Sequence, residues 1–316
     1  MKKILITGAM GQIGSELTVF MRERYGRDAV IASGRRDPGD DHPVKDGPYE
    51  LVDCMDRGRV AEVVKKHNID TIIHLAAVLS AVGEKDPLAA WNLNMGTLLN
   101  TLEVAREYSC KYFTPSSIGA FGPGSPQDNT PQDTIQRPRT IYGVSKVAGE
   151  LLCDYYYAKF GLDTRGVRFP GLISYVTPPG GGTTDYAVDI YYGAIKNKSY
   201  TSFIKEGTYM DMMYMPDALK AVCDLMEADP AKLKHRNAFN VTAMSFEPSM
   251  IAAEIKKHIP EFKMDYDVDP VRQAIAESWP NYMDPSCAVE EWGFKAAYDL
   301  PKMTVDMLAK LKEKLK

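Results

Sequence analysis

Short apolar runs and longer amphipathic stretches alternate along the first half of the chain. Apolar runs predict strands, and apolar positions three and four residues apart predict helices. The predicted strands are 3–7, 29–34, 49–53, 71–77, 111–117 and 164–170, and the predicted helices between them are 11–25, 59–68, 91–108 and 141–160. This alternation is typical of an α/β protein with a doubly wound parallel sheet, which binds ligands at the carboxyl ends of its strands.

The regular alternation loosens after residue 171. Shorter pieces follow, with helices predicted at 185–197, 216–228, 247–258 and 301–315 and strands at 202–204 and 238–242. We therefore predict a Rossmann-type dinucleotide-binding domain over 1–171. Residues 172–316 are predicted to form a smaller α/β lobe, mainly for substrate, with some segments returning to the main sheet.

Composition excludes several classes of function. The 316 residues are 45% hydrophobic and carry a net charge of -4, so they offer no basic face and a nucleic acid is not an expected partner. No apolar run approaches the roughly 20 residues of a membrane span, and the start of the chain does not resemble a signal peptide, which predicts a cytoplasmic protein. The five cysteines form no CxxC pair and the five histidines do not cluster, so we expect reduced thiols and no metal site.

A glycine-rich loop joins the first strand to the first helix. In LITGAMGQIG the glycines are Gly8, Gly11 and Gly14, which permit a tight turn and let the helix N-terminus hold a pyrophosphate. Its position at the first strand-to-helix junction favours dinucleotide binding over plain packing. Asp53, at the end of the third strand, is predicted to accept a hydrogen bond from the adenine amino group, and a local cap or turn is the alternative.

Tyr142 and Lys146 lie one helical turn apart on the same face of the helix over 141–160. A tyrosine, with an ordinary pKa of about 10, is a poor base at neutral pH. A nearby ammonium and the positive charge of an oxidised nicotinamide would stabilise the phenolate. Ser117, at the end of the KYFTPSS strand, would supply a hydroxyl that orients a substrate alcohol.

These motifs resemble those of the extended short-chain dehydrogenase/reductase family. The resemblance rests on TGAMGQIG, HLAA, NMGT, PSSIGAFG and YGVSK, in that order. It extends over nearly the whole chain to the short-chain type of L-threonine 3-dehydrogenase, through GLISYVTPPGGGTTDYAVDIYYGAI, MMYMPDAL, AMSFEPS and ESWPNYMD. The resemblance implies NAD-dependent oxidation of L-threonine to 2-amino-3-oxobutyrate in threonine catabolism, without a metal, by a homodimer.

The resemblance also assigns roles to individual positions. Tyr142 corresponds to the general base, Lys146 to its activator and Ser117 to the hydroxyl partner. The expected cofactor-binding residues are Gly8, Gly11, Gln12, Ile13, Gly14, Arg35, Asp53, Leu75, Ala76, Ala77, Asn94, Tyr142, Lys146 and Pro170. The expected substrate-binding residues are Ser80, Ser116, Ser117, Tyr142, Gly182, Thr184, Asp185 and Trp279.

The segment 178–185 combines two prolines, three glycines, two threonines and an aspartate. We interpret it as a substrate lid, in which the glycines act as a hinge or allow a close backbone approach, the helix N-terminus attracts a carboxylate and Asp185 pairs with an α-ammonium. The alternative is a plain helix cap, because Thr and Asp are good N-caps. Trp279 is expected either to line the substrate pocket or to be a core aromatic residue of the smaller lobe.

The choice of dinucleotide rests on Gly34-Arg35-Arg36. An NAD-preferring site usually has a carboxylate about 20 residues past the last loop glycine, where this chain has Gly34. Arg35 and Arg36 could pair with a 2′-phosphate, or both could point into solvent while Asp37 holds the ribose. We expect NAD as the working cofactor, with measurable use of NADP.

Two other functions remain open. A nucleotide-sugar epimerase or dehydratase shares the glycine loop and the Tyr-x-x-x-Lys pair, but would need basic and aromatic groups for a nucleotide diphosphate. A dinucleotide-sensing regulator without catalysis would not explain the joint presence of Ser117, Tyr142 and Lys146.

Overall fold

The computed structural model describes residues 1–178, 180 and 182–316, which form two compact units. The first unit contains residues 1–117, 140–168 and 219–239, and the second contains 118–139, 169–218 and 240–316. The chain therefore passes between the units several times. Segment 118–139 belongs to the second unit, and segment 219–239 returns to the first.

A six-stranded parallel sheet forms the centre of the first unit. Its strand order is β3-β2-β1-β4-β5-β7, with the topology of a Rossmann fold, and this confirms the predicted fold class. The strands are β1 (Ile4–Thr7), β2 (Val30–Gly34), β3 (Tyr49–Leu51), β4 (Thr71–His74), β5 (Lys111–Phe113) and β7 (Thr164–Arg165). Because β1 lies between β2 and β4, its last residue, Thr7, is opposite both Ser33 and His74.

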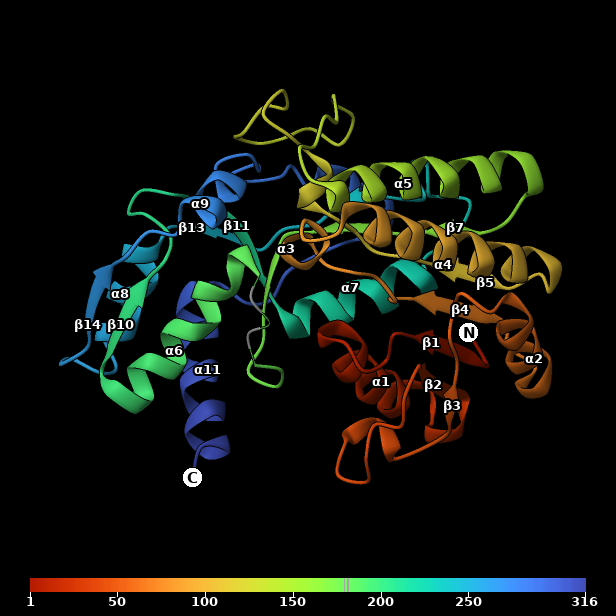
Figure 1. Ribbon diagram of the computed structural model, residues 1–316, viewed down its shortest axis with the longest axis horizontal. Coiled ribbons are helices and arrows are strands. Elements are labelled where there is room, and N and C mark those ends of the chain that lie inside the picture. Colours follow the sequence, from red (N-terminus) through yellow and green to blue (C-terminus); the bar gives the residue numbers. More distant parts are fainter. Residues whose placement is uncertain (179, 181) are drawn as a thin grey trace. The chain divides into compact units, whose positions relative to one another are not determined.

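Helices cover both faces of this sheet, with α4 and α5 side by side on one face and α1 and α7 on the other (Figure 1). The helices are α1 (Gln12–Tyr25), α2 (Arg57–His67), α3 (Ser80–Gly83), α4 (Pro87–Glu107), α5 (Ile141–Phe160) and α7 (Met215–Glu227), the last of which begins in the second unit. Apolar side chains of α2, α4 and α5 pack on the sheet in one continuous core.

Local signals define the helix that carries the candidate catalytic pair. The Thr140 hydroxyl accepts a hydrogen bond from the Gly143 amide at 3.0 Å and caps the first turn of α5. The helix ends at Gly161, whose left-handed conformation, with φ of 69°, suits glycine. The cap fixes where α5 begins, and so places Tyr142 in its first turn.

The second unit is built from smaller sheets and five helices of the described residues. Strands β9 (Gly171–Ile173), β11 (Met210–Tyr214) and β13 (Met244–Phe246) form one sheet, and β10 (Ser199–Ser202) pairs with β14 (Lys263–Tyr266). The helices are α6 (Tyr186–Asn197), α8 (Pro248–Lys256), α9 (Pro270–Ala276), α10 (Ser286–Trp292) and α11 (Leu300–Lys314). Side chains of α6, α8 and α11 share one apolar core.

The structure corrects several predicted strands. Those at 111–117 and 164–170 are each interrupted, and their distal parts form β6 (Ser116–Ser117) and β8 (Val167–Phe169). The strand predicted at 202–204 is β10, which ends at residue 202, and that predicted at 238–242 is β12 (Phe239–Asn240). Strand β11 was not predicted because its sequence, MDMMY, lacks the β-branched residues that mark strands. Among the described residues, no helix combines the length and apolarity needed to cross a bilayer.

Candidate active site

The glycine-rich loop packs too closely for side chains. Gly8 has a φ of +68°, and a Cβ there would lie 2.7 Å from the Ala76 amide nitrogen. A Cβ on Gly14 would lie 2.3 Å from the Gly8 carbonyl oxygen, and the Gly11 amide donates to that same oxygen at 3.0 Å. These contacts hold the loop against the residues that follow β4.

The start of α1 suits an anionic group. In the part of the chain that the structure describes, no side chain caps this helix, and its first turn contains no acidic residue. The amides of Gln12, Ile13 and Gly14 are therefore available to a pyrophosphate, which the helix dipole also favours. The loop and helix together fit a bound dinucleotide, and Leu75, Ala76 and Ala77 lie beside them after β4.

Lys146 connects α5 to the chain between β5 and β6. Its Nζ donates a hydrogen bond to the Pro115 carbonyl oxygen at 2.7 Å and lies 5.4 Å from the centre of the Tyr142 ring. Pro115 directly precedes Ser116 and Ser117. The contact therefore keeps the ammonium beside Tyr142 and close to the serine strand.

A buried ion pair lies one helical turn beyond Lys146. Glu150 accepts hydrogen bonds from Arg168, at 3.0 Å to Nε and 2.9 Å to Nη2, and both side chains are less than a tenth exposed. The Ser116 hydroxyl donates to the same carboxylate. Sequence reasoning missed Glu150 and Arg168. The available signal was a glutamate within the apolar run GELLC on the inner side of α5.

A cavity of about 40 Å³, lined by both polar and apolar groups, lies between Lys146 and the ends of β4 and β5 and has room for a few water molecules. Burial lowers the pKa of His74 to about 3, with a smaller contribution from the Lys146 charge, so this imidazole is neutral. Its Nδ1 lies 2.9 Å from the Thr7 hydroxyl. The cavity is lined by His74, Leu75, Ala76, Ala77, Asn94, Leu98, Thr114, Pro115, Ser116, Ser145, Lys146, Gly149, Glu150 and Asn237.

Two of the remaining expected residues of the first unit, Asn94 and Asp53, have local partners. The Asn94 amide bonds both backbone groups of Val78, at 2.7 and 3.2 Å, and so holds the loop after β4. One carboxylate oxygen of Asp53 accepts from the Met55 amide at 2.9 Å and closes a turn. Ser80 begins α3, and Arg35 is exposed just after β2. Their roles toward cofactor and substrate stay predictions.

The other expected substrate residues lie in the second unit, as does Pro170, which is buried between β8 and β9. The Asp185 carboxylate accepts a hydrogen bond from the Gly182 amide at 2.7 Å, which is the geometry of a cap. A Cβ on Gly171 would lie 2.7 Å from Cγ2 of Thr184, so this glycine lets Thr184 pack on β9. Pro179 and Gly181 of the predicted lid lie outside the described residues.

Trp279 is 9% exposed and packs against Ile118, Phe121 and Met283 in a small apolar cluster of the second unit. Its surroundings are those of a core aromatic residue. The substrate role that the resemblance gives to Trp279 stays a prediction.

The chain is similar to known proteins over its whole length. Residues 4–242 match the model of the NAD dependent epimerase/dehydratase family. An uncharacterized epimerase/dehydratase of Staphylococcus saprophyticus is 59% identical, over 100% of this chain and 99% of that protein. The L-threonine dehydrogenase of Clostridium difficile is 67% identical with a TM-score of 0.98, over 99% of this chain and 98% of that chain.

A second solved structure is similar at greater evolutionary distance. It is a monomeric L-threonine 3-dehydrogenase from a metagenome, 40% identical with a TM-score of 0.94, over 99% of this chain and 100% of that chain. The resemblance noted in the sequence is thus confirmed. With its glycine loop, its Tyr-x-x-x-Lys helix and the match over three quarters of its length, this chain belongs to the NAD dependent epimerase/dehydratase family.

Proposed function

We propose that this protein oxidises the 3-hydroxyl of L-threonine to give 2-amino-3-oxobutyrate, with NAD as the acceptor. Its similarity to L-threonine dehydrogenases over nearly the full length of the chain carries this proposal. The arrangement of the first unit supports it, because Lys146 lies beside Tyr142 and contacts the backbone next to the serine strand.

The roles proposed for the side chains are those that the family resemblance implies. The Tyr142 phenolate takes the hydroxyl proton of the substrate while the Lys146 ammonium stabilises the phenolate. The Ser117 hydroxyl holds the substrate oxygen in line with Tyr142. Bound NAD would supply the acceptor for the hydride at C3, and with the proton taken by Tyr142 the alcohol would lose one proton and one hydride to become a ketone.

Substrate selection is proposed to use polar groups. Threonine has little apolar area, so its affinity must come from hydrogen bonds and charge pairs in a dry site. Asp185 would pair with the α-ammonium, and the amides at the start of the 183–185 turn would receive the carboxylate. Ser80 and Thr184 would add hydroxyl contacts, and segment 178–185 would close over the substrate.

A direct assay tests the reaction. NAD reduction is followed with L-threonine, with a UDP-sugar and with no substrate, and product from the UDP-sugar arm is analysed for epimerisation. We expect reduction only with L-threonine. Conversion of the UDP-sugar without threonine oxidation would favour the nucleotide-sugar epimerase instead, and binding of NAD without any turnover would favour the regulator.

Two variants connect that activity to the site. Tyr142→Phe should lower turnover about 10²- to 10⁴-fold while NAD binding persists, because only the proton acceptor is lost. Lys146→Ala should lower turnover and also weaken NAD binding, since its ammonium would reach the ribose hydroxyls. Tyr157→Phe, on the same helix but 41% exposed, is the matched control and should keep full activity.

A two-fold dimer is also proposed, through α4 and α5. Of the apolar residues of α5, Leu151 and Tyr155 are 63% and 52% exposed, whereas Leu152 and Tyr156 pack in the core. Leu151 and Tyr155 are four residues apart and thus share one face. Sedimentation should give a dimer at micromolar concentration, and Leu151→Lys should dissociate it. A monomeric wild-type protein would contradict the proposal.

A further inference from the structure

The end of β2 departs from the usual dinucleotide site. A Rossmann domain that selects NAD places a carboxylate there, which accepts a hydrogen bond from the 2′-hydroxyl of the adenosine ribose and repels a 2′-phosphate. In this chain β2 ends at Gly34, and two exposed arginines follow. The loop and the start of α1 fit a dinucleotide, but the expected acceptor is missing at this position.

A tyrosine hydroxyl occupies the space beside Gly34. A Cβ built on Gly34 would lie 2.5 Å from Oη of Tyr49 and 3.3 Å from Cγ of Met10. In an aspartate, each carboxylate oxygen lies roughly 2.4 Å from its own Cβ. The Tyr49 hydroxyl oxygen, which comes from the neighbouring strand β3, therefore lies about as far from the Cβ position of residue 34 as the carboxylate oxygen of an aspartate at residue 34 would lie.

The hydroxyl is fixed and neutral. Its hydrogen is donated to the Arg36 carbonyl oxygen at 2.8 Å, which leaves lone pairs on Oη to accept from another group. Burial raises the pKa of Tyr49, and the nearby Asp37 charge raises it further, so the phenol keeps its proton. The result is an oxygen acceptor without charge.

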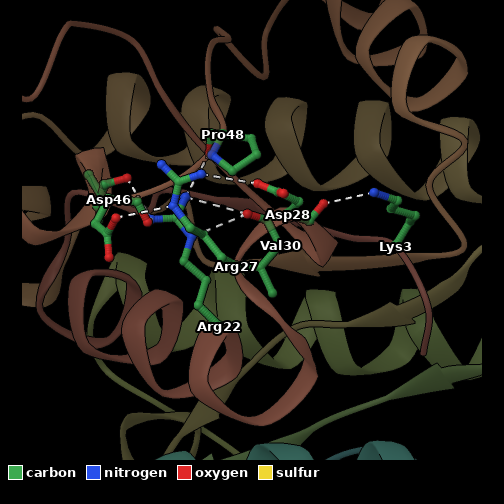
Figure 2. Close-up of polar contacts among 8 residues, drawn as sticks. Lys3, Arg22, Arg27, Asp28, Val30, Asp46 and Pro48 are labelled. Carbon is green, nitrogen blue, oxygen red and sulfur yellow. Dashed lines mark hydrogen bonds and ion pairs between the residues drawn. The ribbon is translucent and has the colours of Figure 1, made fainter.

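Arg22 holds the loop that leads to Tyr49. Its buried guanidinium donates to the carbonyl oxygens of Val44 at 2.7 Å, Asp46 at 2.8 Å and Pro48 at 2.7 Å, with Asp46 and Pro48 beside it in Figure 2. Gly47, between them, has a φ of +135°, and a Cβ there would lie 2.6 Å from Cζ of Arg22. The buried arginine therefore holds the loop that leads into Tyr49, and Tyr49 itself is the first residue of β3, opposite Ala32 of β2.

The carboxylate that follows the two arginines in the sequence, Asp37, is already engaged. Asp37 accepts hydrogen bonds from the Gly39 amide and from Nζ of Lys45, each at 2.9 Å. Lys45 belongs to the segment that Arg22 holds, so this pair turns Asp37 toward that segment. By contrast, Arg35 and Arg36 are exposed and their side chains form no ion pair with the residues that the structure describes.

We propose that the Tyr49 hydroxyl takes the place of the acidic residue at the end of β2. It accepts a hydrogen bond from the ribose 2′-hydroxyl of NAD, and as a neutral group beside two arginines it does not exclude the 2′-phosphate of NADP. This inference rests on the proposed function only in that the protein binds a dinucleotide. It follows that NAD is preferred over NADP by less than about tenfold, since one neutral hydrogen bond sets the difference.

Dissociation constants measured by calorimetry for NAD and NADP, without threonine, test the inference. Tyr49→Phe keeps the ring and removes the acceptor, so NAD should bind about 2- to 10-fold more weakly, the equivalent of one neutral hydrogen bond. NADP binding should change by less than about twofold. Thermal melting of the same samples checks the fold, and the exposed Arg36 carbonyl can bond to water instead.

A second pair of variants restores the carboxylate. Gly34→Asp alone forces Tyr49 to move, because the new Cβ of residue 34 would lie 2.5 Å from Oη of Tyr49. In Gly34→Asp/Tyr49→Phe the nearest ring atom, Cζ, lies 3.7 Å away, which is ordinary contact, and only the Met10 side chain, with Cγ at 3.3 Å, must shift slightly. The double variant should bind NADP at least about tenfold more weakly relative to NAD. Gly34→Ala/Tyr49→Phe has the same packing without the charge and should not discriminate.

Several results would overturn the inference. The first is a wild-type protein that binds NADP more than tenfold more weakly than NAD. The second is a Tyr49→Phe variant that binds NAD as tightly as the wild type. The third is a loss of NAD preference in Asp37→Asn, which would make Asp37 the acceptor. Failure of the threonine assay with both dinucleotides still bound would count against the proposed reaction alone.

Discussion

Glu150 should be the most sensitive polar residue of the first unit. Its carboxylate joins α5, which carries Tyr142 and Lys146, to Arg168 on β8 and to Ser116 on β6. Glu150→Ala would remove the carboxylate while the Arg168 side chain, only 7% exposed, stays in the protein interior.

The expected loss follows from this burial. Removing one partner of a buried ion pair costs about 3–5 kcal/mol, because the other charge has lost its solvation and then loses its counter-charge. Glu150→Gln keeps the shape and one acceptor oxygen, so its cost should be smaller, about 1.5–3 kcal/mol for charged hydrogen bonds. Glu150→Leu/Arg168→Met replaces both charges by apolar groups and should recover most of the stability.

Urea unfolding followed by circular dichroism, together with turnover of L-threonine, provides the measurement. The free energy of unfolding should fall in the order wild type, the Leu/Met double variant, Gln, Ala. In the double variant, turnover should stay below wild type although NAD still binds, because Ser116 no longer has the acceptor that fixes the strand before Ser117.

A cost below about 1 kcal/mol for Glu150→Ala would refute this reasoning, since it would mean that Arg168 does not depend on the carboxylate. Equal losses for Glu150→Ala and the double variant would also contradict it. They would show that removing the unpaired Arg168 charge recovers no stability, so that this buried charge is not the source of the loss.

Three further predictions concern other parts of the molecule. Because the pKa of His74 lies near 3 in the folded protein and near 6.5 when exposed, the unfolded state binds an extra proton between these values. Stability should therefore decrease as pH falls through this window, by about 1.4 kcal/mol per pH unit, and His74→Gln should flatten that dependence in urea titrations. In Gly171→Ala the new Cβ would collide with Met212 and would lie 2.7 Å from Thr184, so KM for L-threonine should rise while the Kd for NAD stays unchanged. The control variant Gly124→Ala adds its Cβ in open space and should have no effect. An unaltered KM would remove Thr184 from the substrate site. Threonine oxidation should survive exhaustive chelation with EDTA, and activity lost to EDTA and restored by zinc would reject a metal-free reaction.

The sequence alone was sufficient for features that depend on local spacing. Alternating strands and helices predicted the parallel sheet, and the four-residue interval between Tyr142 and Lys146 placed them on one face of a helix. The glycine positions predicted a tight turn between the first strand and the first helix. The first two features follow from the periodicity of strands and helices, and the turn follows from the backbone freedom of glycine.

Contacts between distant residues were decided only by the tertiary structure. The sequence showed that a carboxylate is missing at Gly34, but not that Tyr49, on the next strand, fills the space. Nor did it indicate that Glu150 pairs with Arg168 or that burial keeps His74 neutral. Partners, burial and charge state depend on which side chains meet across the sheet. Which side chains meet depends on the order of the strands and on the positions of loops such as 43–48. A pattern within a few residues does not determine either of these.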